Sequence, residues 1–168
     1  MTSQLKCRVG GLTLLELLVV IAIISITAVV AIPSLQPLTS NTDARRITEE
    51  LRQDLMFARS SALTSGTLVT IDPVELNDWN AGWTIFSQDG ELRTKSVVSD
   101  NNEIQSQLLT DDGAALLDAF SFDERGRINA GGTVVFTISV EGCTGNNITS
   151  LIINPVGQII AQGAACED

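Results

Sequence analysis

Glu16 is the residue most open to a chemical role, because it is a lone carboxylate near the start of a long apolar run. The run extends from Leu12 to Ile32, and Glu16 is its only charged residue. An ionised carboxylate at membrane depth costs at least ~2.5 kcal/mol unless another group pairs with it. We therefore expect Glu16 to meet a positively charged partner.

Two pairs of adjacent acids, Asp111 with Asp112 and Asp123 with Glu124, could in principle bind a cation or act as general acid and base. Each pair lies in a glycine-containing stretch, as solvated turns commonly do. The chain has no histidine, which excludes His-based triads and His-containing metal sites. We expect no catalytic residue, no metal, no cofactor and no small-molecule substrate, and we predict that the protein is not an enzyme.

The apolar run is long enough to cross a membrane. Its 21 residues would rise about 30 Å as a helix, which is about the thickness of the bilayer's hydrocarbon core. It is too long for a cleaved signal peptide. Lys6 and Arg8 precede it without any acid, so the N-terminus is expected in the cytoplasm and the C-terminal part on the other side of the membrane. The prediction is a single-pass membrane protein.

Composition bears on partners and on redox state. The net charge is −10, and removal of residues 1–11 with Lys6 and Arg8 would change it to −12, which disfavours nucleic acid as a partner. Cys143 and Cys166 both lie in the part expected to be exported. Two cysteines in an oxidising compartment predict a disulfide, with two free thiols as the alternative.

After the run, a helical pattern extends over residues 33–66. Pro33 and Pro37 should bend the helix, or melt it locally, and Ser40 with Asp43 three residues later indicates a new N-terminal cap. Gly66 should end the helix as a left-handed cap. One apolar stripe follows helical spacing: Ile47, Leu51, Leu55, Ala58 and Ala62.

Residues 67–168 instead show short extended runs separated by Gly and Asp turns. Eight strands are expected, at 67–71, 82–86, 91–98, 104–109, 117–122, 133–140, 150–153 and 158–161. Loops are expected around Gly113 and Gly145. Antiparallel sheet packed on the helical stripe gives an α+β fold. Trp79 and Trp83 are interpreted as core residues, and Arg59 as the partner of a nearby acid or carbonyl.

The N-terminal residues resemble the type IV prepilin family, whose members have a short basic leader ending in Gly before an apolar run with one acid. The matching stretch is Gly-Leu-Thr-Leu-Leu-Glu-Leu, residues 11–17, with Leu12 in place of the usual Phe. The resemblance implies that prepilin peptidase cleaves after Gly11, so that residues 1–11 are the leader, and methylates the amine of Leu12. It also implies that Glu16 pairs with the N-terminal amine of a neighbouring subunit and that Pro33 kinks the helix.

Three later stretches resemble the GspH/FimT group of minor pilins and pseudopilins: residues 55–71, 79–86 and 122–138. The resemblance implies a type IV pilin-like fold in which the helix has a membrane-spanning and assembly segment (12–32) and a periplasmic part (33–66), followed by a β-rich periplasmic domain (67–168). It also implies anchoring in the inner membrane and assembly with other minor pilins and a major pilin.

Three functions follow from this resemblance. The first is a minor pilin in the tip complex that primes assembly of a type IV pilus, slightly favoured by the C-terminal cysteines. The second is the minor pseudopilin H of the type II protein secretion system. The third is a DNA-binding minor pilin for natural transformation. It is disfavoured because the turn where DNA-binding relatives carry Gly-Arg-x-Arg reads Gly157, Gln158, Ile159, Ile160 here.

Overall fold

The computed structural model describes residues 13–96, 102–141, 145–146 and 148–166; of these, residues 29–40 and 102 are described by their backbone alone. Within these residues one long helix precedes nine strands. The helix α1 (Leu14–Ser65) has 52 residues. The chain divides at Gln36 into an N-terminal unit and a second compact unit that begins at Pro37.

The helix α1 continues through both prolines. Of the two expected outcomes near these prolines, a bend or local melting, the melting does not occur, and the predicted cap at Ser40 is wrong because Ser40 lies inside the helix. A proline removes one backbone hydrogen bond and crowds one carbonyl, and the bonds of the flanking turns can hold the helix together across it. The kink at Pro33 stays a prediction. The end of the helix is as predicted, since Gly66 has φ +66° and its N–H donates to the Ala62 carbonyl at 3.0 Å.

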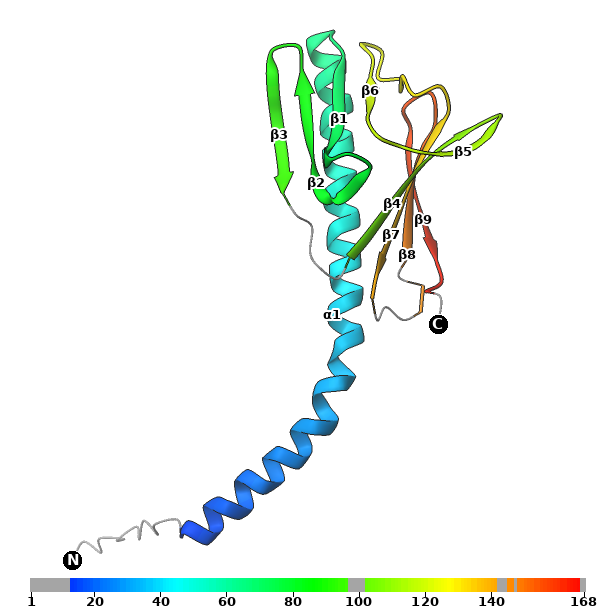
Figure 1. Cartoon of the computed structure of the whole chain (residues 1–168). Helices are drawn as coiled ribbons and strands as arrows, with labels where there is room; N and C mark the ends of the chain where they lie inside the picture. The colour runs from blue at the N-terminus through cyan, green and yellow to red at the C-terminus, as the bar shows by residue number, and fades with distance from the viewer. Residues whose placement is uncertain (1–12, 97–101, 142–144, 147, 167–168) are drawn as a thin grey trace, which may run out of the picture. The chain divides into compact units, whose positions relative to one another are not determined.

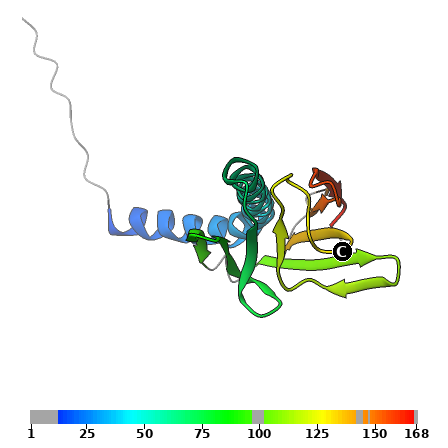
Figure 2. The same cartoon turned by 90° about the horizontal axis from the view of Figure 1, so that it is seen from above.

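The strands form two antiparallel sheets, which lie beside the C-terminal half of α1 (Figures 1 and 2). The four-stranded sheet has the order β3-β2-β1-β6 and the five-stranded sheet the order β5-β4-β7-β8-β9. Their bounds are β1 (Val69–Glu75), β2 (Asp78–Ser87), β3 (Gly90–Ser96), β4 (Asn102–Thr110), β5 (Gly113–Leu116), β6 (Phe120–Phe122), β7 (Thr133–Val140), β8 (Ile148–Ile153) and β9 (Ile159–Ala164).

Most strands fall where the sequence places them, and β7 has the predicted bounds. The region around Gly113 differs. It was predicted to be a loop, but it turns the chain from β4 into β5, with Leu109 paired to Ala114. The predicted strand at 117–122 is reduced to the three residues of β6. Exposed Ala and Leu residues gave no alternating pattern there, so the hairpin had no sequence signal beyond its Asp-Asp-Gly turn.

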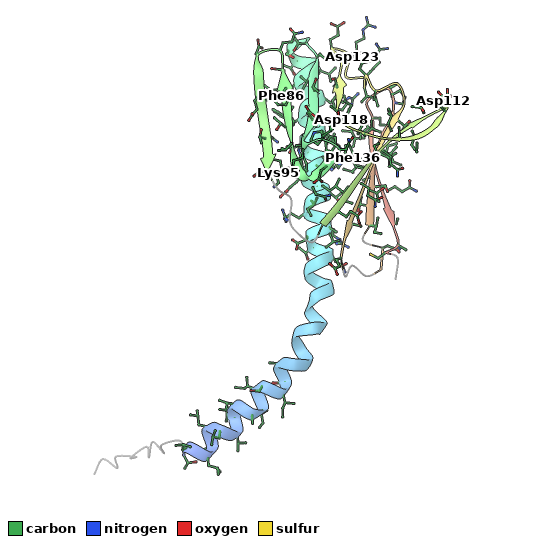
Figure 3. The ribbon with its side chains drawn as sticks, viewed as in Figure 1. Phe86, Lys95, Asp112, Asp118, Asp123 and Phe136 are labelled. Carbon is green, nitrogen blue, oxygen red and sulfur yellow. The ribbon has the colours of Figure 1, made fainter. Side chains whose placement is uncertain are left out.

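The core lies where the helical stripe meets the inner faces of both sheets. All five predicted stripe residues are buried. Trp79 and Phe136 are also buried, and their rings meet edge to face with centroids 4.6 Å apart. Figure 3 shows Phe136 in the interior of the sheet region. The strand β7 alternates strictly between buried and partly exposed residues, as expected for a strand with one face on the core.

Candidate assembly site

The first turn of α1 fixes the position of Glu16. Thr13 precedes the helix, and its side-chain Oγ1 accepts the Glu16 backbone N–H at 3.2 Å, while its carbonyl accepts the Leu17 N–H at 3.1 Å. Thr13 and Glu16 thus have the spacing of a capping box. A carboxylate in the first turn is also stabilised by the helix dipole. Local sequence alone therefore places the Glu16 carboxylate at the N-terminal end of the helix.

Large apolar side chains surround Glu16 on every side of the helix. They are between 45 and 77% exposed in the isolated chain: Leu14, Leu15, Leu17, Leu18, Val19, Val20, Ile21, Ile23, Ile24 and Ile26. A helix that is apolar all round is normally buried in a bundle or a membrane. No helical stretch among the described residues is both long and apolar enough to cross a bilayer.

The hydroxyl groups in this segment are satisfied within the helix. Ser25 Oγ donates to the Ile21 carbonyl at 2.7 Å, and Thr27 Oγ1 donates to the Ile23 carbonyl at 3.0 Å. Such bonds to the preceding turn remove the need for outside polar partners. Glu16 is the exception, because the described residues offer its carboxylate no salt-bridge partner. Gly11 and Leu12 lie outside the described residues, so their processing stays a prediction.

A second polar cluster joins the C-terminal half of α1 to the four-stranded sheet. Asp54 is buried, and its carboxylate accepts the Trp83 indole N–H at 2.9 Å and contacts the Arg93 guanidinium. The guanidinium also lies 4.3 Å from the centre of the Phe57 ring. Sequence analysis missed Asp54. A signal was available, because residue 54 follows Leu51 by three positions and so lies on the apolar stripe.

Beside this cluster, Glu50 receives two cations. Lys95 Nζ lies 2.7 Å from its Oε2, and Arg46 Nη1 lies 3.0 Å from its Oε1. Partial burial tends to raise the pKa of Glu50, but the hydrogen bonds from Lys95 and then Arg46 outweigh it, so the pKa lies below its ordinary value. Glu49, the preceding residue, forms an ion pair with Arg52 at 3.3 Å.

Arg59 connects the loop that follows β6 to the loop that follows β8. Its Nε donates to the Gly126 carbonyl at 2.9 Å and its Nη2 to the Val156 carbonyl at 3.5 Å, as expected for a partner of carbonyls. Gly157 has φ +77°, and a Cβ there would lie 1.8 Å from the Gly126 oxygen. Only glycine therefore allows these two loops to approach each other so closely around the arginine.

The two acid pairs occupy turns, as interpreted from sequence. Asp111 and Asp112 form the turn of the β4–β5 hairpin, and Figure 3 shows Asp112 at its tip. Asp123 accepts the backbone N–H groups of Arg127 and Arg125, and the Arg127 side chain also contacts it at 3.0 Å. The pKa of Asp123 is lowered, and the largest cause is the hydrogen bond that its carboxylate accepts from the Arg127 backbone N–H. Within the described residues, no cluster of three or more potential ligands could hold a metal ion.

The C-terminal cysteines lie near the end of the five-stranded sheet. The Cys166 N–H donates to the Gly145 carbonyl at 2.8 Å, which brings the C-terminus to the segment that follows Cys143. Cys143 itself lies outside the described residues. The disulfide between the two therefore stays a prediction.

The protein has a type IV pilin-like α+β fold. Its long helix has an acid near its start among apolar side chains, and the C-terminal half of the helix packs on antiparallel sheets. The sequence profile described as Type II transport protein GspH matches residues 48–157, and the profile described as Prokaryotic N-terminal methylation motif matches residues 6–32. The chain belongs to the GspH family. A comparison with curated proteins found no match.

Solved structures share this fold. The type IV minor pilin FimU of Pseudomonas aeruginosa strain PAO1 is similar over 78% of this chain and 100% of its own, with a TM-score of 0.61 and 20% identity. The minor pseudopilin EpsH from the type 2 secretion system of Vibrio cholerae is similar over 75% of this chain and 99% of its own, with a TM-score of 0.54 and 10% identity. The predicted fold class and family are thus confirmed.

Family membership makes the protein a minor pilin or pseudopilin, which is a structural subunit. It implies a membrane-anchored chain that assembles with other pilins, and the methylation motif implies processing by prepilin peptidase.

Proposed function

We propose that this protein is a low-abundance subunit that joins other minor pilins in the tip complex of a type IV pilus and primes its assembly. Its work is physical rather than catalytic: the apolar N-terminal helix packs beside its neighbours, and the folded domain offers them a specific face. The predicted disulfide between Cys143 and Cys166 favours the pilus over the secretion machine, because C-terminal disulfides are usual in pilus minor pilins.

The observation that carries the proposal is the Glu16 carboxylate, which has no salt-bridge partner in the part of the chain that the structure describes and lies among exposed apolar side chains. Leu15 and Leu17, its neighbours in sequence, are 73 and 55% exposed, so the segment needs an apolar environment. A charge in that environment is tolerated when an opposite charge neutralises it. The methylated amine at Leu12 of a neighbouring subunit supplies that charge, and pairing becomes possible only when subunits lie side by side.

The minor pseudopilin of a type II secretion system is the second candidate. It is favoured by the description of the matching family profile and by the similarity to EpsH. Both machines would use Glu16 and the apolar helix in the same way, so the two candidates differ in partners rather than in mechanism.

DNA binding is disfavoured because the sequence that follows Gly157 lacks the arginines of the DNA-binding relatives. The segment that follows this turn is the uncharged strand β9, and Arg127, near the other turn, is neutralised by Asp123. An overall charge of −10 further opposes contact with phosphates.

Cross-linking in the native membrane, purification of the full-length protein and mass spectrometry of its partners test the proposal. Recovery of a major pilin and pilus minor pilins would support it. Recovery of secretion pseudopilins with a secretin would instead identify the protein as a pseudopilin of the secretion machine. Glu16→Leu should insert in the membrane but lose these partners. Ser25→Ala is the matched control, because its hydroxyl bonds only within the helix. Normal partner recovery by Glu16→Leu would refute the assembly role.

A further inference from the structure

The four edges of the two sheets are protected to different degrees. Exposed edges invite pairing with another chain, and proteins commonly shorten them or place charges on them. The edge strand β3 carries Glu91, Arg93 and Lys95. The edge strands β6 and β5 have three and four residues. The remaining edge strand, β9, has six residues, and its sequence, Ile-Ile-Ala-Gln-Gly-Ala, contains neither a charge nor a proline.

The free backbone groups of β9 can be assigned from its hairpin with β8. The Asn154 N–H donates to the Gln158 carbonyl at 3.1 Å, and hydrogen-bonded pairs then alternate along the two strands. Ile159, Ala161 and Gly163 consequently turn their N–H and carbonyl groups away from β8. They are the groups to which a further strand would bond.

The same three residues direct their side-chain positions toward the inner face of the sheet, since Ile159 and Ala161 lie opposite the buried Ile153 and Leu151. Ala161 and Gly163 are nevertheless exposed, and a Cβ built on Gly163 would meet no atom within 4 Å. The core layer therefore stops short of this edge. An added strand would find open space there.

A groove of about 300 Å³ begins where this space meets α1. The helix and the start of β9 line it together: Arg52, Met56, Arg59, Ser60, Leu63, Gln158 and Ile159. Met56 and Leu63 are 49 and 50% exposed on the helix wall. The groove thus combines an apolar wall with an unpaired strand edge, which suits an extended peptide better than a helix, because only an extended peptide can bond to the edge.

The charges at the groove indicate which peptide fits. Both charged residues that line it are arginines, in a chain with a net charge of −10. Arg59 donates hydrogen bonds to two neutral carbonyls, and no carboxylate in the described parts of the chain forms an ion pair with it. Its positive charge is therefore available to an anionic group.

We propose that the open edge of β9 and the arginine-lined groove beside α1 form a docking site for an extended, acidic segment of a neighbouring subunit, which adds a strand to the five-stranded sheet. That the neighbour is a pilin-type subunit rests on the proposed function. Alternate apolar side chains of the segment would cover Met56 and Leu63, and a carboxylate would meet Arg59, since Arg52 is already paired with Glu49.

The test uses full-length protein in its native membrane, with a photoactivatable phenylalanine placed at Met56 or, as a control, at Leu76, which is 77% exposed in the turn after β1. The Met56 position should give an adduct with one identified subunit, mapped to a peptide that contains Asp or Glu. Ala161→Pro, which removes an outward N–H, should reduce the adduct about fivefold, the scale of one net hydrogen bond. Ala161→Ser keeps the N–H and should leave the adduct unchanged.

Charge is tested separately on the helix surface, where folding is insensitive to the change. Without the photo-cross-linker, Met56→Glu should weaken co-purification of the same subunit more than Met56→Lys does, because both lose the apolar contact but only Glu repels an acidic segment. Equal adducts from Leu76 and Met56, no effect of Ala161→Pro, or equal losses with Glu and Lys at position 56 would each overturn the inference. If Glu16→Leu abolishes partner recovery but the β9 and Met56 variants behave as wild type, only this inference fails; if Glu16→Leu recovers partners normally, the proposed function fails.

Discussion

Removing the carboxylate of Asp54 should destabilise the folded domain more than most single substitutions. Its oxygens accept the buried Trp83 N–H at 2.9 Å and contact Arg93, whose side chain is 46% exposed. A hydrogen bond to a charged group contributes about 1.5–3 kcal/mol, and the exposed ion pair contributes about 0.2–1 kcal/mol after solvent screening. Asp54→Ala should therefore lower the free energy of unfolding by about 2–4 kcal/mol.

Asp54→Asn separates the two contributions. The amide oxygen can still accept the Trp83 N–H, so the expected loss is about 1 kcal/mol, from the charge and the weaker hydrogen bond. Trp83→Phe removes the donor, and Asp54→Ala on that background should cost less than it does alone.

Denaturant unfolding of the full-length protein in detergent, followed by circular dichroism, measures all four variants. The argument is refuted if Asp54→Ala and Asp54→Asn lower the free energy of unfolding equally, or if the effects of Asp54→Ala and Trp83→Phe are additive. Either result would mean that the buried hydrogen bond does not stabilise the fold.

Three further effects on stability follow from the structure. Gly157→Ala should cost at least about 3 kcal/mol, because its Cβ would overlap the Gly126 carbonyl and a positive φ is strained for alanine; denaturant unfolding measures the loss. Because the pKa of Glu50 is lowered in the folded state, its stabilisation is present above the unfolded pKa and is lost as pH falls through the folded pKa, so Glu50→Gln should flatten that part of the pH–stability curve. Cys143→Ser or Cys166→Ser should lower the free energy of unfolding by about 3 kcal/mol if the predicted disulfide closes its 24-residue segment, with the reduced wild type unfolding like the variants.

Each of these effects has a matched comparison. Gly90→Ala also places alanine at a positive φ but in open space, so a loss as large as that of Gly157→Ala would contradict the steric argument. Asp72 titrates in the opposite direction: burial and then the nearby Asp118 raise its pKa, so Asp72→Asn should stabilise the protein above that pKa. If Glu50→Gln leaves the acidic part of the pH–stability curve unchanged, the ion-pair argument is contradicted. Two free thiols counted without reductant would end the disulfide prediction.

The features that sequence analysis predicted well depend on interactions between near neighbours. The apolar stripe from Ile47 to Ala62, the cap at Gly66 and the bounds of β7 follow from helical spacing, backbone freedom and strand alternation. The burial of Trp79 and Trp83 follows from their size and apolar surface. Local rules failed at Ser40. Its sequence matches a capping pattern, but the residue lies inside a helix that the hydrogen bonds of the flanking turns hold together.

The remaining features needed chain segments far apart in sequence to meet. Asp54 and Arg93 are 39 positions apart, and Arg59 and Val156 are 97 apart, so no local pattern could identify these contacts as pairs. Strand order was equally open, because short strands with similar composition can pair in several ways.

The sequence by itself determined the apolar stripe of the helix, the position of Glu16 near the helix start, the family and most of the strands, because each depends on residues a few positions apart. Only the tertiary structure decided which strands lie at the sheet edges, that β9 is the long uncharged one, and that its edge opens onto a groove on α1. Those properties arise from the packing of distant segments, where shape and burial rather than local preference select the arrangement.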